Sequence, residues 1–229
     1  MKQNHYRLPL LFSVIFFLLF ALLLTLLLTT DRAPVGQFDR PVGLSDYNGD
    51  FQEAVGKSGL AYTVSEITGI LLLLALPGFA FFGIYQWFKR KKLSLVDRDL
   101  FCLAGLYVIT LGCYGFFEFV IINYRPVFEA VTEYEASFPS SHTLLAVTFG
   151  LSGASQLGSR IKSDKLRATA VTALCLLTLI TVLGRALSGV HWLTDIYGAI
   201  LLGGGLVCLY QTAVCLTKKE SNRLGGTDL

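Results

Sequence analysis

The sequence predicts an all-α, polytopic membrane protein with six transmembrane helices and both termini in the cytoplasm. Composition is the first reason. Of 229 residues, 53% are hydrophobic and only 15% are charged, whereas soluble domains carry roughly 25% charged residues. With a mean hydropathy of +0.59, the polar residues are too few to cover a surface that faces water. The same composition excludes a disordered chain, a fibrous repeat and a disulfide scaffold.

The distribution of the charges is the second reason. A helix needs about 20 apolar residues to cross a ~30 Å hydrocarbon core, and six stretches of suitable length contain no Asp, Glu, Lys or Arg. They are continuously apolar instead of alternating with a period of two, which favours helices over a β-barrel. After adjustment for polar ends, the predicted spans lie near 8–30, 67–88, 100–122, 140–159, 168–187 and 195–217.

The basic residues orient these spans. With both termini inside, most of the 19 Lys and Arg residues fall on the cytoplasmic side, as the positive-inside rule requires. The net charge of +3 is therefore spread over inner loops and does not indicate nucleic-acid binding. We expect a multi-pass protein of the plasma membrane whose partner is the bilayer, and the sequence does not indicate an oligomeric state. The basic residues left outside are Arg32, Arg40, Lys57, Arg125 and Arg185.

Residues 1–229 are predicted to form a single membrane-embedded domain with one long extracytoplasmic loop, 31–66. An amphipathic stretch near Asp50–Val55 indicates a short interfacial helix in this loop. Gly203-Gly204-Gly205 indicates a close helix–helix contact. The five cysteines lie in apolar stretches without a close pair, which predicts buried structural thiols and neither a disulfide nor a zinc site. They are Cys102, Cys113, Cys175, Cys208 and Cys215.

Ionisable residues gather at the outer ends of the last four predicted spans. Such groups are costly at the edge of an apolar span, so their default interpretation is functional. A lone histidine there is often only an interfacial hydrogen-bonding group, and an arginine is often a headgroup anchor. However, two of the three histidines occur at this one face. The segments are Glu118-x6-Arg125-Pro126, Pro139-Ser140-Ser141-His142, Gly184-Arg185, and His191-x3-Asp195.

Together these residues indicate a phosphoryl-transfer site. Arg125 and Arg185 can contact phosphate oxygens in a forked geometry. Pro139-Ser140-Ser141 provides the start of a helix, whose free N–H groups bind anions, and Ser140 adds a hydroxyl donor.

The two histidines divide the remaining chemistry. Asp195 lies four residues after His191, on the same side of a helix, and can fix the tautomer of that imidazole. His191 is therefore the candidate nucleophile. His142 has no carboxylate nearby in the sequence, so it is free to protonate the leaving oxygen and later to activate water.

These motifs resemble the three signature motifs of the type 2 phosphatidic acid phosphatase superfamily, which includes bacterial membrane lipid phosphatases and the soluble vanadium haloperoxidases. The resemblance implies a helical bundle of that type, a phosphohistidine on His191 oriented by Asp195, and His142 as acid and then base. It also implies phosphate binding by Arg125, Arg185, Ser140 and the backbone of Ser141. Members of this size need no metal or other cofactor and hydrolyse lipid phosphates at the outer leaflet.

Three positions depart from the family pattern. Ser141 replaces a glycine and Gly184 replaces a serine, and both changes are mild. Glu118 replaces a lysine, so a carboxylate stands near a dianionic ligand and repels it. Glu118 would lie two helical turns from Arg125 on one face; it could pair with Arg32 or Arg40, stay protonated, or face a cationic headgroup, and these alternatives remain open.

The leading hypothesis is a metal-independent hydrolase that removes phosphate from a lipid phosphate or diphosphate, with its active site on the extracytoplasmic side. Undecaprenyl diphosphate, phosphatidylglycerol phosphate and phosphatidic acid are the candidate substrates, the first slightly favoured by analogy with the family. One alternative is a lipid phosphotransferase that uses the same phosphohistidine. Another is a non-catalytic lipid-binding or transport protein with a degenerate site, although a transporter should carry charges near mid-span.

Overall fold

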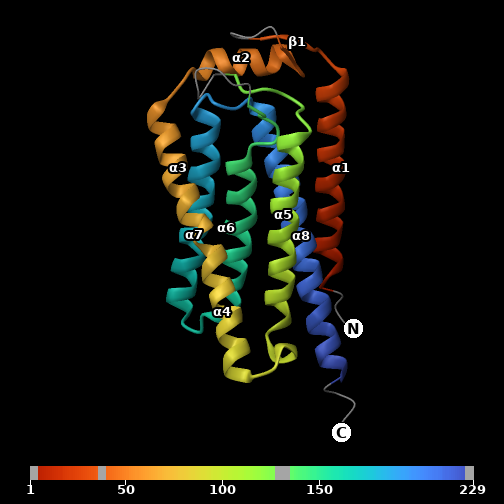
Figure 1. Cartoon of the computed structure of the whole chain (residues 1–229), viewed down its shortest axis with the longest axis vertical. Coiled ribbons are helices and arrows are strands. Elements are labelled where there is room, and N and C mark those ends of the chain that lie inside the picture. Colours follow the sequence, from red (N-terminus) through yellow and green to blue (C-terminus); the bar gives the residue numbers. More distant parts are fainter. Residues whose placement is uncertain (1–4, 36–39, 127–134, 225–229) are drawn as a thin grey trace.

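The computed structural model describes residues 5–35, 40–126 and 135–224, which form a bundle of long helices (Figure 1). A two-residue antiparallel pair, β1 (Ala33–Pro34) with β2 (Pro41–Val42), follows the first helix. The helices are α1 (Arg7–Thr29), α2 (Ser45–Val55), α3 (Gly59–Leu73), α4 (Ala75–Arg90), α5 (Arg98–Phe119), α6 (Ser141–Arg160), α7 (Asp164–Leu187) and α8 (Leu193–Leu224), with a short 3-10 helix, η1 (Leu93–Leu95).

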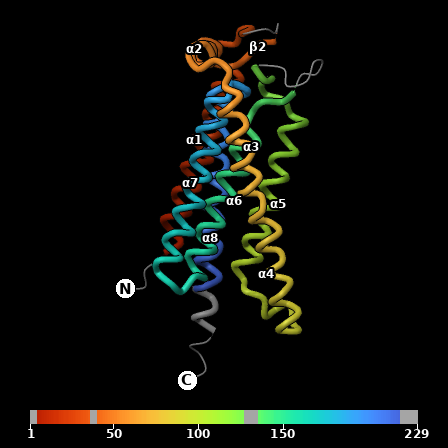
Figure 2. The backbone as a smooth tube through the Cα atoms, turned by 90° about the vertical axis from the view of Figure 1, so that its left-hand side faces the viewer, coloured from red at the N-terminus to blue at the C-terminus, as the bar shows by residue number. Residues whose placement is uncertain are grey.

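The long helices run along one axis, and α2 lies across one end of the bundle (Figures 1 and 2). At the opposite end α1 begins and α8 ends (Figure 1). Helix α6 is central, because it packs against α3, α5, α7 and α8, while α1 packs on the outer side of α8. The predicted all-α bundle is confirmed.

Five helical segments are long and apolar enough to cross a membrane: Arg7–Thr29, Gly59–Arg90, Arg98–Phe119, Asp164–Leu187 and Leu193–Lys218. They make the chain a multi-pass membrane protein. Helix α6 has a comparable length but more polar side chains. These are buried against its neighbours, as Ser152 illustrates by donating to the Tyr107 hydroxyl at 3.3 Å, so they need no lipid contact. The count of six spans and the cytoplasmic placement of the termini remain predictions.

Two helix ends differ from the predicted span boundaries. The second span was predicted to begin at 67, but α3 begins at Gly59, where Ser58 caps the helix by accepting from the Ala61 amide at 3.3 Å. The loop 31–66 is therefore shorter than expected, and Glu66 lies inside α3. The third span was predicted to continue to 122, but α5 ends at Phe119. Arg125 consequently lies in the segment after the helix and does not share a helical face with Glu118.

The helix expected near Asp50–Val55 is present as α2. Two hydrogen bonds attach α2 to residues before and after the turn that leads into α8. Asn48 Nδ2 donates to Thr194 Oγ1 at 3.0 Å, and Gln52 Nε2 donates to the Gly189 carbonyl oxygen at 2.8 Å. Helix α2 therefore holds the segment in which His191 lies.

The close helix contact expected at Gly203-Gly204-Gly205 is confirmed. A Cβ atom on Gly205 would lie 2.7 Å from the Phe17 ring of α1, and Ser13 of α1 donates to the Gly205 carbonyl oxygen at 2.9 Å. The five cysteines are unpaired. The expectation that they are buried was wrong: Cys175 is exposed on α7 and the other four are only partly buried, because an apolar side chain in a membrane helix can face lipid as well as protein.

Candidate active site

His191 lies in the turn between α7 and α8, two residues before α8 begins, and only 1% of it is exposed. The expected helical His191–Asp195 pair was wrong in detail, since only Asp195 is helical. The two side chains are nevertheless neighbours, with Nδ1 of His191 3.6 Å from Oδ2 of Asp195. Ser137 lies between them: its Oγ is 3.3 Å from Nδ1 and donates to Oδ2. The Trp192 amide donates to the same Oδ2 at 2.8 Å.

This arrangement fits the His191 tautomer with its proton on Nδ1. Among the residues that the structure describes, Nε2 of His191 is buried and has no hydrogen-bond partner. Burial lowers the pKa of this imidazole below its usual value, and the charges of Arg125 and Arg185 lower it further, while Asp195 opposes them. At neutral pH the ring is therefore uncharged, and Nε2 carries a lone pair.

His142 lies in the first turn of α6, where it meets Arg185 and Glu66. Nη2 of Arg185, a residue only 1% exposed, lies 2.6 Å from Nδ1 of His142. The same Nη2 donates to Oε1 of Glu66 at 2.6 Å, and Nε2 of His142 is 3.1 Å from that oxygen. Glu66 of α3 is thus the carboxylate partner that His142 lacks in the nearby sequence.

Sequence reasoning missed Glu66 and Ser137. The criterion of charge-free stretches placed Glu66 outside the second span and so treated it as a loop residue. A signal was available, because an ionisable residue within an apolar helix marks a functional position by default. Ser137 carries no comparable signal, since a serine before a helix is common in any protein.

Arg125 follows α5 and is held by the chain beside it. Its Nε lies 3.1 Å from Oε2 of Glu135, and its amide donates to the Glu135 carbonyl oxygen at 3.2 Å. The indole nitrogen of Trp192 donates to the carbonyl oxygen of Tyr124 at 2.7 Å. The Arg125 segment is therefore attached to the residue that follows His191.

The predicted helix start is confirmed, because α6 begins at Ser141 with Ser140 as its N-cap. The Ser140 hydroxyl oxygen accepts from the Thr143 amide at 3.4 Å, and the Ser140 amide donates to the Asp195 carbonyl oxygen at 3.1 Å. The start of α6 is thereby fixed to the first turn of α8. The Ser140 amide is already used, so the Ser141 amide is the better candidate for contact with an anion.

Glu118 lies in the last turn of α5 and is exposed. With Ser141 and His191 it lines a cavity of about 10 Å³, which is room for about one water molecule. Binding a phosphate group there requires side chains to move. Among the described residues Glu118 forms no ion pair, and the Arg40 guanidinium instead lies 5.2 Å from the centre of the Tyr124 ring.

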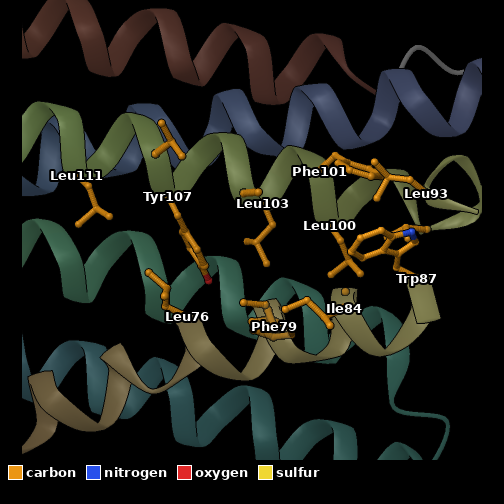
Figure 3. Close-up of a pocket in the computed structure, with 15 residues that line it drawn as sticks. Leu76, Phe79, Ile84, Trp87, Leu93, Leu100, Phe101, Leu103, Tyr107 and Leu111 are labelled. Carbon is orange, nitrogen blue, oxygen red and sulfur yellow. The ribbon is translucent and has the colours of Figure 1, made fainter. Parts of the chain in front are cut away.

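A larger groove of about 380 Å³ lies between α4 and α5 and shares no residue with this site (Figure 3). Side chains of α4, such as Phe79 and Trp87, face side chains of α5, such as Leu103, across it (Figure 3). None of its lining residues is charged, so it offers no cation for a phosphate group. The polar cluster at the α2 end of the bundle is the candidate active site.

The chain belongs to the PAP2 superfamily, whose family model matches residues 14–214. It is similar in fold to the crystal structure of the first transmembrane PAP2 type phosphatidylglycerolphosphate phosphatase from Bacillus subtilis. The TM-score is 0.64 at 20% sequence identity, and the match covers 87% of this chain and 94% of the other. A comparison with curated proteins gave no match. The resemblance expected from the motifs is confirmed.

Proposed function

We propose that this protein is a membrane phosphatase that hydrolyses a lipid phosphate or lipid diphosphate through a phosphohistidine on His191. The observation that carries the proposal is the state of this imidazole. Its Nδ1 faces Ser137 and Asp195, its Nε2 is buried without a partner among the described residues, and the charges of Arg125 and Arg185 act on it. A neutral nitrogen beside two guanidinium groups suits attack on a phosphorus atom. Membership of the PAP2 superfamily supports the same chemistry.

In the first step, Nε2 of His191 forms a bond to phosphorus while the bond to the leaving oxygen breaks. His142 gives that oxygen a proton. The guanidinium groups and the amide of Ser141 bind the three remaining oxygens, where charge accumulates. In the second step, His142 takes a proton from water as the water oxygen attacks phosphorus and releases His191. No step requires a metal ion.

A lipid substrate follows from the position of the site at one end of a membrane-spanning bundle. The distribution of basic residues favours the extracytoplasmic side for this end. Undecaprenyl diphosphate, phosphatidylglycerol phosphate and phosphatidic acid are the substrates to compare, and the name of the structurally similar Bacillus subtilis protein adds weight to the second.

One observation favours a second function. Glu118 stands where the family pattern has a cation, and Glu66 and Glu135 contact the two arginines. A site this rich in carboxylates would suit a lipid-binding protein that has lost catalysis.

The experiment that separates the two functions is phosphate release by purified protein from these three lipids, with and without a chelator of divalent ions. The phosphatase predicts turnover that survives chelation and is abolished in the His191→Ala variant. A binding protein predicts retention of the lipid without phosphate release. Strict dependence on added magnesium would contradict the metal-free steps.

A further inference from the structure

Glu66 contacts both His142 and Arg185, and it does so through a single oxygen, Oε1. An imidazole and a guanidinium that share one acceptor are fixed relative to each other. The His191 ring has a carboxylate in Asp195, so each histidine of the site has its own acidic partner.

Packing between α3 and α7 fixes the position of Glu66. A Cβ atom on Gly184 would lie 2.9 Å from the Cβ of Ser65 and 3.0 Å from the carbonyl oxygen of Ala61. Thr181 of α7 donates to Thr68 of α3 at 2.8 Å. The glycine that replaces the serine of the family pattern thus permits the close approach that brings Glu66 to Arg185.

The orientation of the His142 ring shows which group faces each of its two nitrogens. Gly69 lies about one turn after Glu66 on α3, and the site of a Cβ on it is 3.6 Å from Cδ2 of His142. The edge of the ring that carries Cδ2 and Nε2 therefore rests against α3, with Nε2 at Glu66. Nδ1 lies 2.6 Å from Nη2 of Arg185, and because a guanidinium only donates, Nδ1 accepts this hydrogen bond in the neutral imidazole.

We propose that Glu66 is a positioning residue for the phosphatase reaction: its Oε1 accepts from the Arg185 guanidinium and lies 3.1 Å from Nε2 of His142, so it keeps the acid–base imidazole beside a phosphate-binding arginine. This inference rests on the proposed function. In the first step a ring proton of the His142 imidazolium moves to the leaving oxygen as the bond from His191 Nε2 to phosphorus forms and the bond from phosphorus to that oxygen breaks. In the second step a proton of the attacking water moves to the His142 ring as the water oxygen bonds to phosphorus and the bond from phosphorus to His191 Nε2 breaks.

The charged groups around His142 come from three elements. Burial, Arg185 of α7 and His191 before α8 disfavour a positive charge on His142, and Glu66 of α3 opposes them. A neutral side chain at 66 therefore lowers the fraction of His142 that carries a transferable proton and leaves the ring less firmly oriented. General acid–base catalysis contributes typically ~10²–10⁴-fold, so we expect Glu66→Gln to lower kcat on a lipid phosphate about 10²-fold.

The test compares two leaving groups. An alkyl or phosphate leaving group needs the proton from His142, but p-nitrophenolate departs without one. With p-nitrophenyl phosphate, Glu66→Gln should release one equivalent of nitrophenolate at close to the wild-type rate. Slow turnover should follow, because the second step still needs His142 as a base. A purely structural role would slow the burst and the lipid reaction equally.

Glu53→Gln is the matched control, since Glu53 is exposed on α2, and it should behave like the wild type. If Glu66→Gln equals this control on the lipid, or slows both reactions alike, the inference is wrong while the proposed function stands. Tighter inhibition by vanadate with undiminished turnover would also overturn it, because Glu66 would then compete with phosphate. If Glu66→Gln fails to fold, Glu66→Asp tests the positioning alone, because its shorter side chain withdraws the carboxylate from His142 while retaining the charge. A lipid reaction slowed more than the burst is again the expected result. If the wild-type protein itself releases no phosphate from the candidate lipids, both the proposed function and this inference are wrong.

Discussion

The hydroxyl group of Ser137 donates a hydrogen bond to Oδ2 of Asp195 and lies 3.3 Å from Nδ1 of His191. The direct distance from Nδ1 to Oδ2 is 3.6 Å, which is too long for a good hydrogen bond. Ser137 therefore connects His191, the proposed nucleophile, with the carboxylate proposed to orient it. All three residues are buried, so the connection is protected from water.

Removal of this hydroxyl should reduce catalysis more than folding. Ser137→Ala leaves one oxygen of Asp195 with fewer donors, at a cost of about 1–3 kcal/mol in the free energy of unfolding. It also frees the His191 ring to rotate, and we expect kcat to fall at least about tenfold. Phosphate release and thermal unfolding of the same sample check both effects. Ser159→Ala, on the exposed part of α6, is the control, and an unchanged kcat would show that Asp195 acts on His191 without Ser137.

The lowered pKa of His191 predicts the acid limb of the pH profile. A histidine whose pKa is lowered in the folded protein stays neutral below its usual titration range, so the nucleophile persists as the pH falls and is lost only at the lowered pKa. The acid limb of kcat/KM, after correction for ionisation of the substrate, should therefore have its midpoint below pH 6.5. Arg125→Gln should shift it upward, because one of the charges that lower the pKa is gone. A limb at or above 6.5 in the wild type would contradict the environment described for His191.

Trp192 should control phosphate affinity through the main chain. Its indole N–H donates to the carbonyl oxygen of Tyr124, the residue before Arg125. Trp192→Phe removes only this hydrogen bond and some buried ring area, so the free energy of unfolding should fall by about 1 kcal/mol. Release of the Arg125 segment should raise the KM and the inhibition constant of vanadate several-fold, with a smaller change in kcat. A change confined to kcat would place the role of Trp192 elsewhere.

Reversal of the charge at Glu118 should strengthen binding of the phosphate group. The carboxylate lies on the wall of the cavity shared with His191 and Ser141, where it repels a dianion. Glu118→Lys restores the cation of the family pattern, and we expect KM for the lipid phosphate to fall about tenfold, which is about 1.4 kcal/mol. Glu53→Lys is the control for net charge. A higher KM in Glu118→Lys would indicate that Glu118 recognises a cationic part of the substrate.

Much of this architecture follows from the sequence. Continuous apolar stretches predicted the long helices, because the cost of burying charge in lipid leaves a strong pattern. The motifs also identified the residues that lie at the α2 end. Successive helical segments of the bundle run in opposite directions, so every second connection lies at the same end (Figure 1).

The errors share a physical cause. A criterion based on charge cannot recognise a charged residue that a helix tolerates because a partner neutralises it, and Glu66 is such a residue through Arg185. The end of α5 at Phe119 and the non-helical position of His191 depend on contacts with distant segments, such as the bond from Trp192 to Tyr124. Local sequence does not encode these contacts.

The most direct test of the central claim is to identify the atom that accepts the phosphoryl group. Brief incubation of the purified protein with a lipid phosphate labelled on phosphorus, followed by quenching at alkaline pH and mapping of the label, reports this atom. The account predicts an acid-labile phosphohistidine at His191 that is absent in His191→Ala. In a His142→Ala variant it should accumulate only with labelled p-nitrophenyl phosphate, whose leaving group needs no proton. Continued turnover with no label on His191, or with the label on another residue, would contradict it.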